Sequence, residues 1–336
     1  MSFSVVVQKR ASSKSKSKQG STGEPQKSAT SSPFPLQLTL PSASPTLPQL
    51  RQAIHAKIPK LHPSRQRIIA ATTQKPLVAP VDENKTTLQE LGVQEGDTLE
   101  VKDLGPQISW RTVFLIEYAG PIAIHPLFYL LAPQLHQSAQ FEPSQVQTLA
   151  LTLIVLHFVK RELETLFVHR FSNGTMPFTN VFKNSFHYWG LCGAFLAYFI
   201  YSPATSRSAL AKVPADSIYA LLRNDTFLLA CTAVWTVAEL ANFHTHLQLM
   251  WLRPKGTRVR KIPRGGAFEL VSCPNYFFEI LAWVAITVLT LSPAALLFIV
   301  VGGVQMGAWA DKKHRTLRKE FKDYPRNRKR MIPFIW

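Results

Sequence analysis

Two arginine- and lysine-rich segments near the end of the chain have the residue types that bind phosphate. Residues 251–264 read WLRPKGTRVRKIPR, and residues 311–330 read DKKHRTLRKEFKDYPRNRKR. Arginine suits phosphate because its planar guanidinium can bond two oxygens at once. Two long apolar stretches separate the segments, which predicts a helical hairpin that returns both segments to one side of a membrane. We interpret the pair as an anion site at a membrane face.

Ionisable and amide side chains also interrupt the apolar stretches, where charge is unfavourable and therefore indicates function. They are Glu117 in the first stretch, Lys160, Arg161, Glu162 and Glu164 in the second, Glu239, Asn242, His244 and His246 in the fourth, and Glu279 in the fifth. Any one of them could equally form an interhelical hydrogen bond or reach the interface. The set clusters towards the cytosolic ends of the second, fourth and fifth stretches, at the level of the basic loops, which predicts a polar site there.

Composition separates a membrane protein from a nucleic-acid binder. The chain has 336 residues, 46% of them hydrophobic, and a formal net charge of +18, which fits both classes. The apolar residues gather in blocks that reach the roughly 20 residues needed to cross a hydrocarbon core, which a nucleic-acid binder does not need. We expect no nucleic-acid partner. Cys192, Cys231 and Cys273 form no CxxC pair, so free thiols and no metal site are predicted.

We predict a multi-pass helical membrane domain, residues 105–336, with six spans. The spans are residues 108–131, 145–167, 186–201, 226–251, 276–291 and 294–310. Lys and Arg are concentrated in the loops after the second and fourth spans and in the tail, whereas residues 133–144 have none. Because positive loops face the cytosol, both termini are predicted to be cytosolic. Residues 202–225 blur this pattern with three basic residues.

Residues 1–104 are predicted to form a separate, small α+β domain. The expected elements are strands at residues 2–8, 34–40, 66–70 and 97–104, a helix at 46–58 and a short, turn-like helical segment at 86–93. This order resembles a ubiquitin-like fold, whose closing segment is similar to DENKTTLQELGVQEGDTLEV. An insertion at residues 11–32, rich in Ser, Lys and Gln, has too little apolar surface to order itself and is predicted to be disordered.

Four segments carry a resemblance to a known family. They read HFVKRELETLFVHRFSNGTMPFTNVFKN, NFHTHLQLMWLRPKGTRVRKIP, VSCPNYFFEILAW and KHRTLRKEFKDYPRNRKRMIPF. Together they look like the very-long-chain trans-2-enoyl-CoA reductases of the endoplasmic reticulum, which belong to the steroid 5-alpha-reductase family, and the N-terminal domain resembles that of the fungal type. ETLFVHRFS and SCPNY are specific to this branch. The basic tail is also similar to those of sterol reductases and isoprenylcysteine methyltransferases.

The resemblance implies the last step of each fatty-acid elongation cycle, which also supplies sphingolipid precursors. In that step NADPH gives hydride to Cβ of a very-long-chain trans-2-enoyl-CoA, and a proton reaches Cα. The chemistry requires a donor that polarises the thioester carbonyl and an acid within reach. The resemblance also implies an endoplasmic reticulum membrane, contact with membrane lipid and association with other fatty-acid elongation enzymes.

The same resemblance implies catalytic roles for three residues. The catalytic pair falls on Lys160 and Tyr276: Tyr276 donates the proton, and Lys160 either favours the ionised phenol or hydrogen-bonds the carbonyl. Without the motif, Tyr276 would be interpreted as an interfacial aromatic anchor. Glu117 matches a catalytic glutamate of the steroid-reducing branch, and an ion pair with Lys160 or Arg161 is the competing interpretation.

Cofactor-binding roles also follow from the resemblance. They fall on Arg161, Asn242, Arg253, Asn275, Glu279, His314 and Tyr324. Leu317 stands where related reductases often have tyrosine, which puts that one contact in doubt. No GxGxxG follows a strand, so a Rossmann site is not supported, and Gly265 and Gly266 are interpreted as a turn. Attraction to anionic lipid is the other interpretation of the basic tail.

Three alternatives to this function remain open from the sequence. One is a steroid or polyprenol enone reductase of the same family. Another is a membrane methyltransferase that uses S-adenosylmethionine, which could share the basic tail. The last is a non-enzymatic adaptor whose ubiquitin-like domain binds elongation partners.

Overall fold

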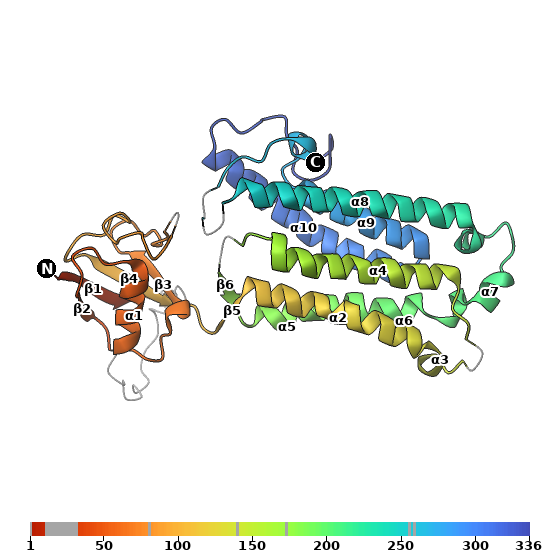
Figure 1. Ribbon diagram of the computed structural model, residues 1–336, viewed down its shortest axis with the longest axis horizontal. Coiled ribbons are helices and arrows are strands. Elements are labelled where there is room, and N and C mark those ends of the chain that lie inside the picture. Colours follow the sequence, from red (N-terminus) through yellow and green to blue (C-terminus); the bar gives the residue numbers. More distant parts are fainter. Residues whose placement is uncertain are drawn as a thin grey trace, which may run out of the picture. The chain divides into compact units, whose positions relative to one another are not determined.

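The computed structural model describes residues 2–10, 33–79, 82–138, 141–171, 174–254, 257 and 260–336. The insertion at residues 11–32, predicted to be disordered, lies outside the described residues. The chain divides into two units, one built mainly from residues 1–108 and the other from most of the remaining chain. Figure 1 shows a small sheet with helix α1 in the first unit and a bundle of long helices in the second.

The N-terminal unit is a four-stranded sheet packed against one helix. Its strands are β1 (Phe3–Lys9), β2 (Leu36–Leu40), β3 (Gln66–Ala70) and β4 (Thr98–Asp103), in the order β2-β1-β4-β3. β1 and β4 are parallel and the other pairs are antiparallel. Alternate residues of β1 pack with α1 (Leu47–Lys57) in a common core. The strands and helix expected from the sequence are confirmed, whereas residues 86–93 form hydrogen-bonded turns.

The second unit is helical. Its α-helices are α2 (Trp110–Leu130), α3 (Ala132–Leu135), α4 (Gln145–Leu163), α5 (Asn180–Ser185), α6 (Leu196–Ile200), α7 (Arg207–Ala211), α8 (Asp225–Leu252), α9 (Pro274–Thr290) and α10 (Pro293–Glu320). The π-helices η3 (Glu164–Val168) and η4 (Phe186–Phe195) extend α4 and precede α6. A short pair of strands, β5 (Gln107–Ser109) and β6 (Thr175–Pro177), belongs mainly to the first unit.

Three of the described helices, α2, α8 and α10, are long and apolar enough to cross a membrane, and α9 is a shorter apolar helix. The chain is thus a helical membrane protein by length and composition. The other two predicted spans correspond to α4, whose last turn carries three charged residues, and to η4 with α6. A topology of six spans stays a prediction.

Helix α10 continues ten residues past the predicted end at Ala310. Residues 311–324 contain no proline or glycine and are rich in Lys, Arg and Glu, which are good helix formers. The first part of the basic tail is therefore helical. The predicted turn at Gly265 and Gly266 is confirmed, because both have positive φ, a conformation that glycine adopts readily.

The bundle is held by aromatic side chains between α2, α4, η4 and α9. The Tyr118 and Phe158 rings lie 6.0 Å apart, Phe158 and Trp283 also 6.0 Å, and Tyr118 and Tyr188 5.3 Å. This packing holds α4 against α2, η4 and α9. The three cysteines are free, as predicted, and all three are buried.

Candidate active site

A closed ring of five polar side chains joins α4, α8 and α9. Lys160 Nζ donates to Glu239 Oε2 and to Asn242 Oδ1, both at 2.7 Å. His157 Nδ1 lies 2.6 Å from Glu239 Oε1, and its Nε2 lies 3.2 Å from Glu279 Oε1. Asn242 Nδ2 donates to Glu279 Oε2 at 3.2 Å, which closes the ring. We call these five residues the polar ring.

Helical spacing explains how the chain builds the polar ring. His157 and Lys160 are three residues apart on α4, and Glu239 and Asn242 are three apart on α8, so each pair shares one helix face. His157, Glu239 and Asn242 are buried. Such burial is tolerated because every charged group in the ring has a partner of opposite charge.

His157 bridges two carboxylates, which indicates its protonation state. A neutral imidazole has one N–H donor, whereas the imidazolium has two, so His157 bonds to both Glu239 and Glu279 only when it is protonated. The charges of the site then balance. Three cations, on His157, Lys160 and Arg161, face three carboxylates, on Glu164, Glu239 and Glu279.

Arg161 forms a second cluster beside the polar ring. Its Nη1 donates to Glu164 Oε2 at 2.7 Å and its Nη2 to Tyr118 Oη at 3.0 Å, and the guanidinium lies 5.2 Å from the Tyr118 ring centroid. Glu164 Oε1 lies 3.0 Å from His246 Nδ1 and 3.5 Å from Lys160 Nζ. The polar ring and the Arg161 cluster therefore share the Glu164 carboxylate.

Glu164, His169 and His246 bring three possible metal ligands within 4.8 Å of one another. Carboxylate and imidazole groups are ligands that zinc prefers. Two cations already lie near this carboxylate, however, with Arg161 at 2.7 Å and Lys160 at 3.5 Å. Burial, followed by the charges of Arg161 and His246, holds the pKa of His169 well below its usual value. The local charge therefore disfavours a further cation and favours an anionic or neutral ligand.

Asn275 and Tyr276 lie in the first turn of α9. The Asn275 carbonyl accepts a 2.8 Å hydrogen bond from Asn242 Nδ2, so the polar ring holds the start of this helix. Asn275 Oδ1 is buried without a hydrogen-bond partner in the described part of the chain. Tyr276 is half-buried, and its ring lies 6.3 Å from that of Trp309.

No described residue, Lys160 included, forms a hydrogen bond with the Tyr276 hydroxyl. In this conformation both that hydroxyl and Asn275 Oδ1 are available to a ligand. They lie on consecutive residues, so a ligand that occupies the start of α9 meets a donor and an acceptor together.

The other predicted cofactor residues form two further groups. His314 Nδ1 and Tyr324 Oη each lie 2.6 Å from Ser272 Oγ, so these two side chains connect α10 and the tail to the segment before α9. Arg253, the residue after α8, donates to the Arg170 carbonyl at 3.0 Å. The structure thus brings Arg161, Asn242, Asn275 and Glu279 together, with His314, Tyr324 and Arg253 in separate contacts.

Glu117 is buried in α2 and has an amide partner. Its Oε1 accepts a 2.6 Å hydrogen bond from Asn184 Nδ2. No ion-pair contact joins Glu117 to Lys160 or Arg161 within the described residues, where Lys160 bonds to residues of α8 and Arg161 to Tyr118, the residue after Glu117. The competing interpretation, a pairing with one of these cations, stays a prediction.

Three residues of these contacts, His157, Asn184 and Ser272, were not predicted from the sequence. His157 carried one usable signal, an imidazole three residues before Lys160 in an apolar helix. Ser272 carried another, because it is the first residue of SCPNY. Asn184 carried none of its own, because a single amide near the end of a helix is common in any membrane protein.

The known proteins to which the chain is similar have names that describe related oxidoreductases. The family model described as 3-oxo-5-alpha-steroid 4-dehydrogenase matches residues 174–336. An enoyl reductase of Schizosaccharomyces pombe is 49% identical over 250 residues, which cover 74% of this chain and 80% of the relative. The very-long-chain enoyl-CoA reductase of Dictyostelium discoideum is 41% identical over 297 residues, covering 88% and 93%. A human protein named trans-2,3-enoyl-CoA reductase-like is 32% identical over 304 residues, covering 87% and 77%.

Proposed function

Because the chain belongs to the family of very-long-chain enoyl-CoA reductases, related to the 3-oxo-5-alpha-steroid 4-dehydrogenases, we propose that it reduces the trans-2,3 double bond of very-long-chain enoyl-CoA thioesters with NADPH. It is an oxidoreductase that acts on a CH–CH bond in fatty-acid elongation. The structural observation that supports the site is the polar ring beside the unbonded hydroxyl of Tyr276.

The described residues fit a nicotinamide dinucleotide. Asn275 Oδ1, buried without a partner, can accept from an amide N–H such as that of the nicotinamide carboxamide. Arg161 and Arg253 supply guanidinium groups of the kind that binds phosphate. NADPH is preferred to NADH in this proposal because the additional 2′-phosphate suits the strongly basic segment at residues 251–264. When bound, the cofactor supplies the hydride.

Two residues carry the proton chemistry in this proposal. Tyr276 donates the proton to Cα, since its hydroxyl has no competing hydrogen bond among the described residues. Lys160 has three N–H donors and uses two of them in hydrogen bonds. The ammonium also lies 3.5 Å from Glu164 Oε1, and its third N–H can turn from there to negative charge on the thioester oxygen or on the Tyr276 phenolate. Glu239, Asn242 and His157 hold the ammonium of Lys160 in place.

Glu117, His314 and Tyr324 have secondary roles in the proposal. Glu117 adjoins the Arg161 cluster through Tyr118, and its carboxylate bonds to an amide rather than to a cation, which is compatible with participation in catalysis. His314 and Tyr324 position Ser272 and the tail beside the cofactor site.

We also propose the cellular setting. Six spans cross the endoplasmic reticulum membrane with both termini in the cytosol, and the alternation of basic loops supports that orientation. Residues 1–104 are a ubiquitin-like domain, an assignment supported by the parallel β1–β4 pair at the centre of the sheet. We expect this domain to contact other elongation enzymes. The product also enters the precursors of sphingolipids.

An assay of the purified protein tests the function. The protein in detergent is incubated with a very-long-chain trans-2-enoyl-CoA and NADPH, and cofactor oxidation and saturated acyl-CoA are both measured. We expect one saturated product per NADPH oxidised and little reaction with NADH. Turnover of a steroid or polyprenol enone in preference to the enoyl-CoA would reject the proposed substrate.

A further inference from the structure

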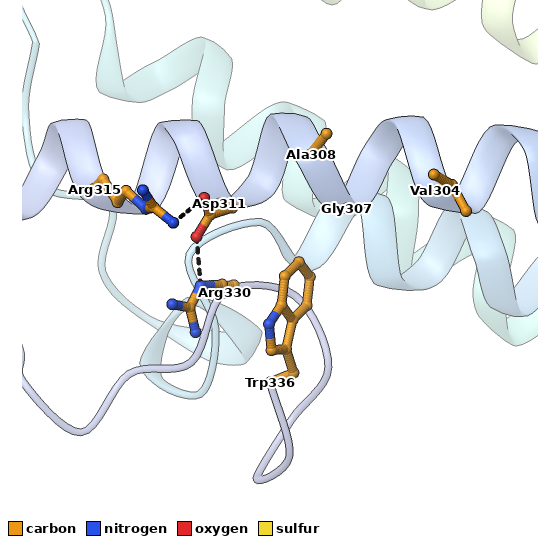
Figure 2. Close-up of a pocket in the computed structure, with 7 residues that line it drawn as sticks. All are labelled: Val304, Gly307, Ala308, Asp311, Arg315, Arg330 and Trp336. Atoms are coloured by element: carbon orange, nitrogen blue, oxygen red, sulfur yellow. Dashed lines mark hydrogen bonds and ion pairs between the residues drawn. The ribbon is translucent and has the colours of Figure 1, made fainter.

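A groove of about 500 Å³ lies on α10, outside the polar ring. It runs between the helix and the C-terminal segment, and its lining includes Gly307, Ala308, Asp311, Arg315, Arg330 and Trp336. Figure 2 shows Asp311 between the two arginines, with Trp336 beside Gly307. We call this site the α10 groove.

Cationic side chains outnumber carboxylate side chains in the α10 groove. Arg315 Nη2 lies 2.9 Å from Asp311 Oδ2, and Arg330 Nε lies 2.7 Å from Asp311 Oδ1. Two cations thus share one carboxylate. Arg330 uses only Nε in this contact, and its terminal nitrogens make no hydrogen bond within the described residues. Arg315 is 74% exposed. Both guanidinium groups can therefore bind a phosphate without losing a buried partner.

An aromatic wall adjoins this charge. The Arg330 guanidinium lies 5.4 Å from the Trp336 ring. Gly307 lies against the same indole, because a Cβ at this position would be 3.5 Å from the nearest ring atom. Ala308, the next residue, also has a small side chain, so a flat group can approach the helix closely. An indole and two arginines together suit a ligand that joins an aromatic base to phosphate.

The α10 groove is coupled to the candidate active site through shared packing. Cys273, Ala310 and Met331 form a small buried cluster, and both Trp336 and Tyr276 pack against it. A single layer of side chains therefore contacts the groove on one side and the proposed proton donor on the other. A ligand with its nucleotide in the groove needs an arm to bring its reacting end to Tyr276.

We propose that the α10 groove binds the phosphorylated adenosine end of the coenzyme A thioester, whose pantetheine arm then extends towards Tyr276. This inference rests on the proposed function. The reaction uses two ligands that carry adenosine and phosphate, so two cationic sites are needed. Arg161 and Arg253, assigned to NADPH, lie on or next to other helices, which leaves the groove for coenzyme A.

Truncated substrates test the proposal. The double variant Arg315→Gln/Arg330→Gln is compared with the unmodified protein on an enoyl-CoA and on the matching enoyl-pantetheine, which lacks adenosine and its phosphates. We expect kcat/KM for the CoA thioester to fall about tenfold or more, the size of losing a charged hydrogen bond, while kcat/KM for the pantetheine thioester stays unchanged.

Two single variants complete the design. Ala308→Phe fills the groove and keeps both arginines, so it should reproduce the selective loss even if Arg330→Gln disturbs the tail. Lys312→Gln removes one positive charge from the same helix outside the groove lining and should change neither rate.

The outcomes distinguish a wrong assignment of the groove from a wrong assignment of the function. Equal losses with both thioesters, unchanged turnover of the CoA thioester, or a selective rise in KM for NADPH would each overturn the groove assignment. If the unmodified protein reduces neither thioester, the proposed function fails first and the groove assignment fails with it.

Discussion

Lys160 donates a 2.7 Å hydrogen bond to Oδ1 of Asn242, a residue 82 positions further along the chain. The same amide donates from Nδ2 to the carbonyl of Asn275 at 2.8 Å. An amide can make both bonds because it has an acceptor at one end and a donor at the other. The Asn242 side chain therefore sets the spacing between the Lys160 ammonium on α4 and the first turn of α9, which contains Tyr276.

Tyr276→Phe should remove the proton donor and leave the fold intact. The hydroxyl makes no hydrogen bond within the described residues, so its deletion breaks no internal contact. We expect kcat to fall about 10²- to 10⁴-fold, the usual contribution of a general acid, with an unchanged melting temperature. Tyr198→Phe is the matched control, because this tyrosine is exposed on α6. Turnover near the normal rate in Tyr276→Phe would rule out the assignment.

Lys160→Met should affect stability and activity together. It leaves Glu239 buried without the ammonium, and breaking a buried ion pair lowers the free energy of unfolding by about 3 kcal/mol. Adding Glu239→Gln removes the uncompensated charge, so the double variant should regain part of the lost stability. Its reductase activity should stay absent. Thermal unfolding in detergent and the NADPH assay measure the two effects, and recovery of activity in the double variant would contradict a catalytic role for Lys160.

Arg253→Leu should weaken NADPH binding more than NADH binding. If this half-buried guanidinium contacts the 2′-phosphate, its loss removes a charge-assisted hydrogen bond, and KM for NADPH should rise about tenfold or more. KM for NADH should change little, because NADH lacks that phosphate. Arg264→Leu, an exposed arginine of the same segment, is the control. Parallel changes for both cofactors would show that Arg253 does not read the 2′-phosphate.

His169→Asn should make stability less sensitive to acid. The pKa of His169 is lower in the folded chain than in the unfolded chain, mainly through burial. Below about pH 6.5 the unfolded state binds a proton that the folded state does not. The free energy of unfolding therefore decreases as the pH is lowered, by up to about 1.4 kcal/mol per pH unit. Above that pH the effect is absent. When the pH is lowered from about 7 to 5.5, the melting temperature of the variant should decrease less than that of the unmodified protein. Equal decreases in the two proteins would exclude this effect.

Local sequence patterns predicted where the helices and strands lie, but they did not predict how these elements contact one another. The alternating valines of β1 and the spacing of Leu50, Ile54 and Ile58 indicated a strand and a helix, and both are present. The parallel pairing of β1 with β4 joins residues some 90 positions apart, and nothing local in either strand encodes it. The span predicted at residues 294–310 covers the apolar part of α10 alone, because hydrophobicity marks the length that crosses lipid and not the basic helical turns beyond it.

The polar residues of the site were found from the sequence, but their partners were not. Lys160, Glu239, Asn242 and Glu279 all stood out as polar groups in apolar helices. The packing of three helices decides which of these residues meet. That packing depends on the shapes of apolar side chains such as Phe158 and Trp283. His157 was passed over because a lone imidazole in an apolar helix gives no sign that two carboxylates face it.

The polar ring also bears on how the protein is made. Helix α4 is synthesised before α8. Its Lys160 and Arg161, and Glu164 just beyond it, meet Glu239, Asn242 and His246 only after about 80 further residues have been added. Insertion of an unpaired charged side chain is opposed by roughly 2.5–3.5 kcal/mol at the centre of a helix, and by less towards its end, where these residues lie. We therefore expect α4 to stay beside the translocation machinery until α8 emerges and to enter the lipid together with it, so that membrane integration and assembly of the active site are one event.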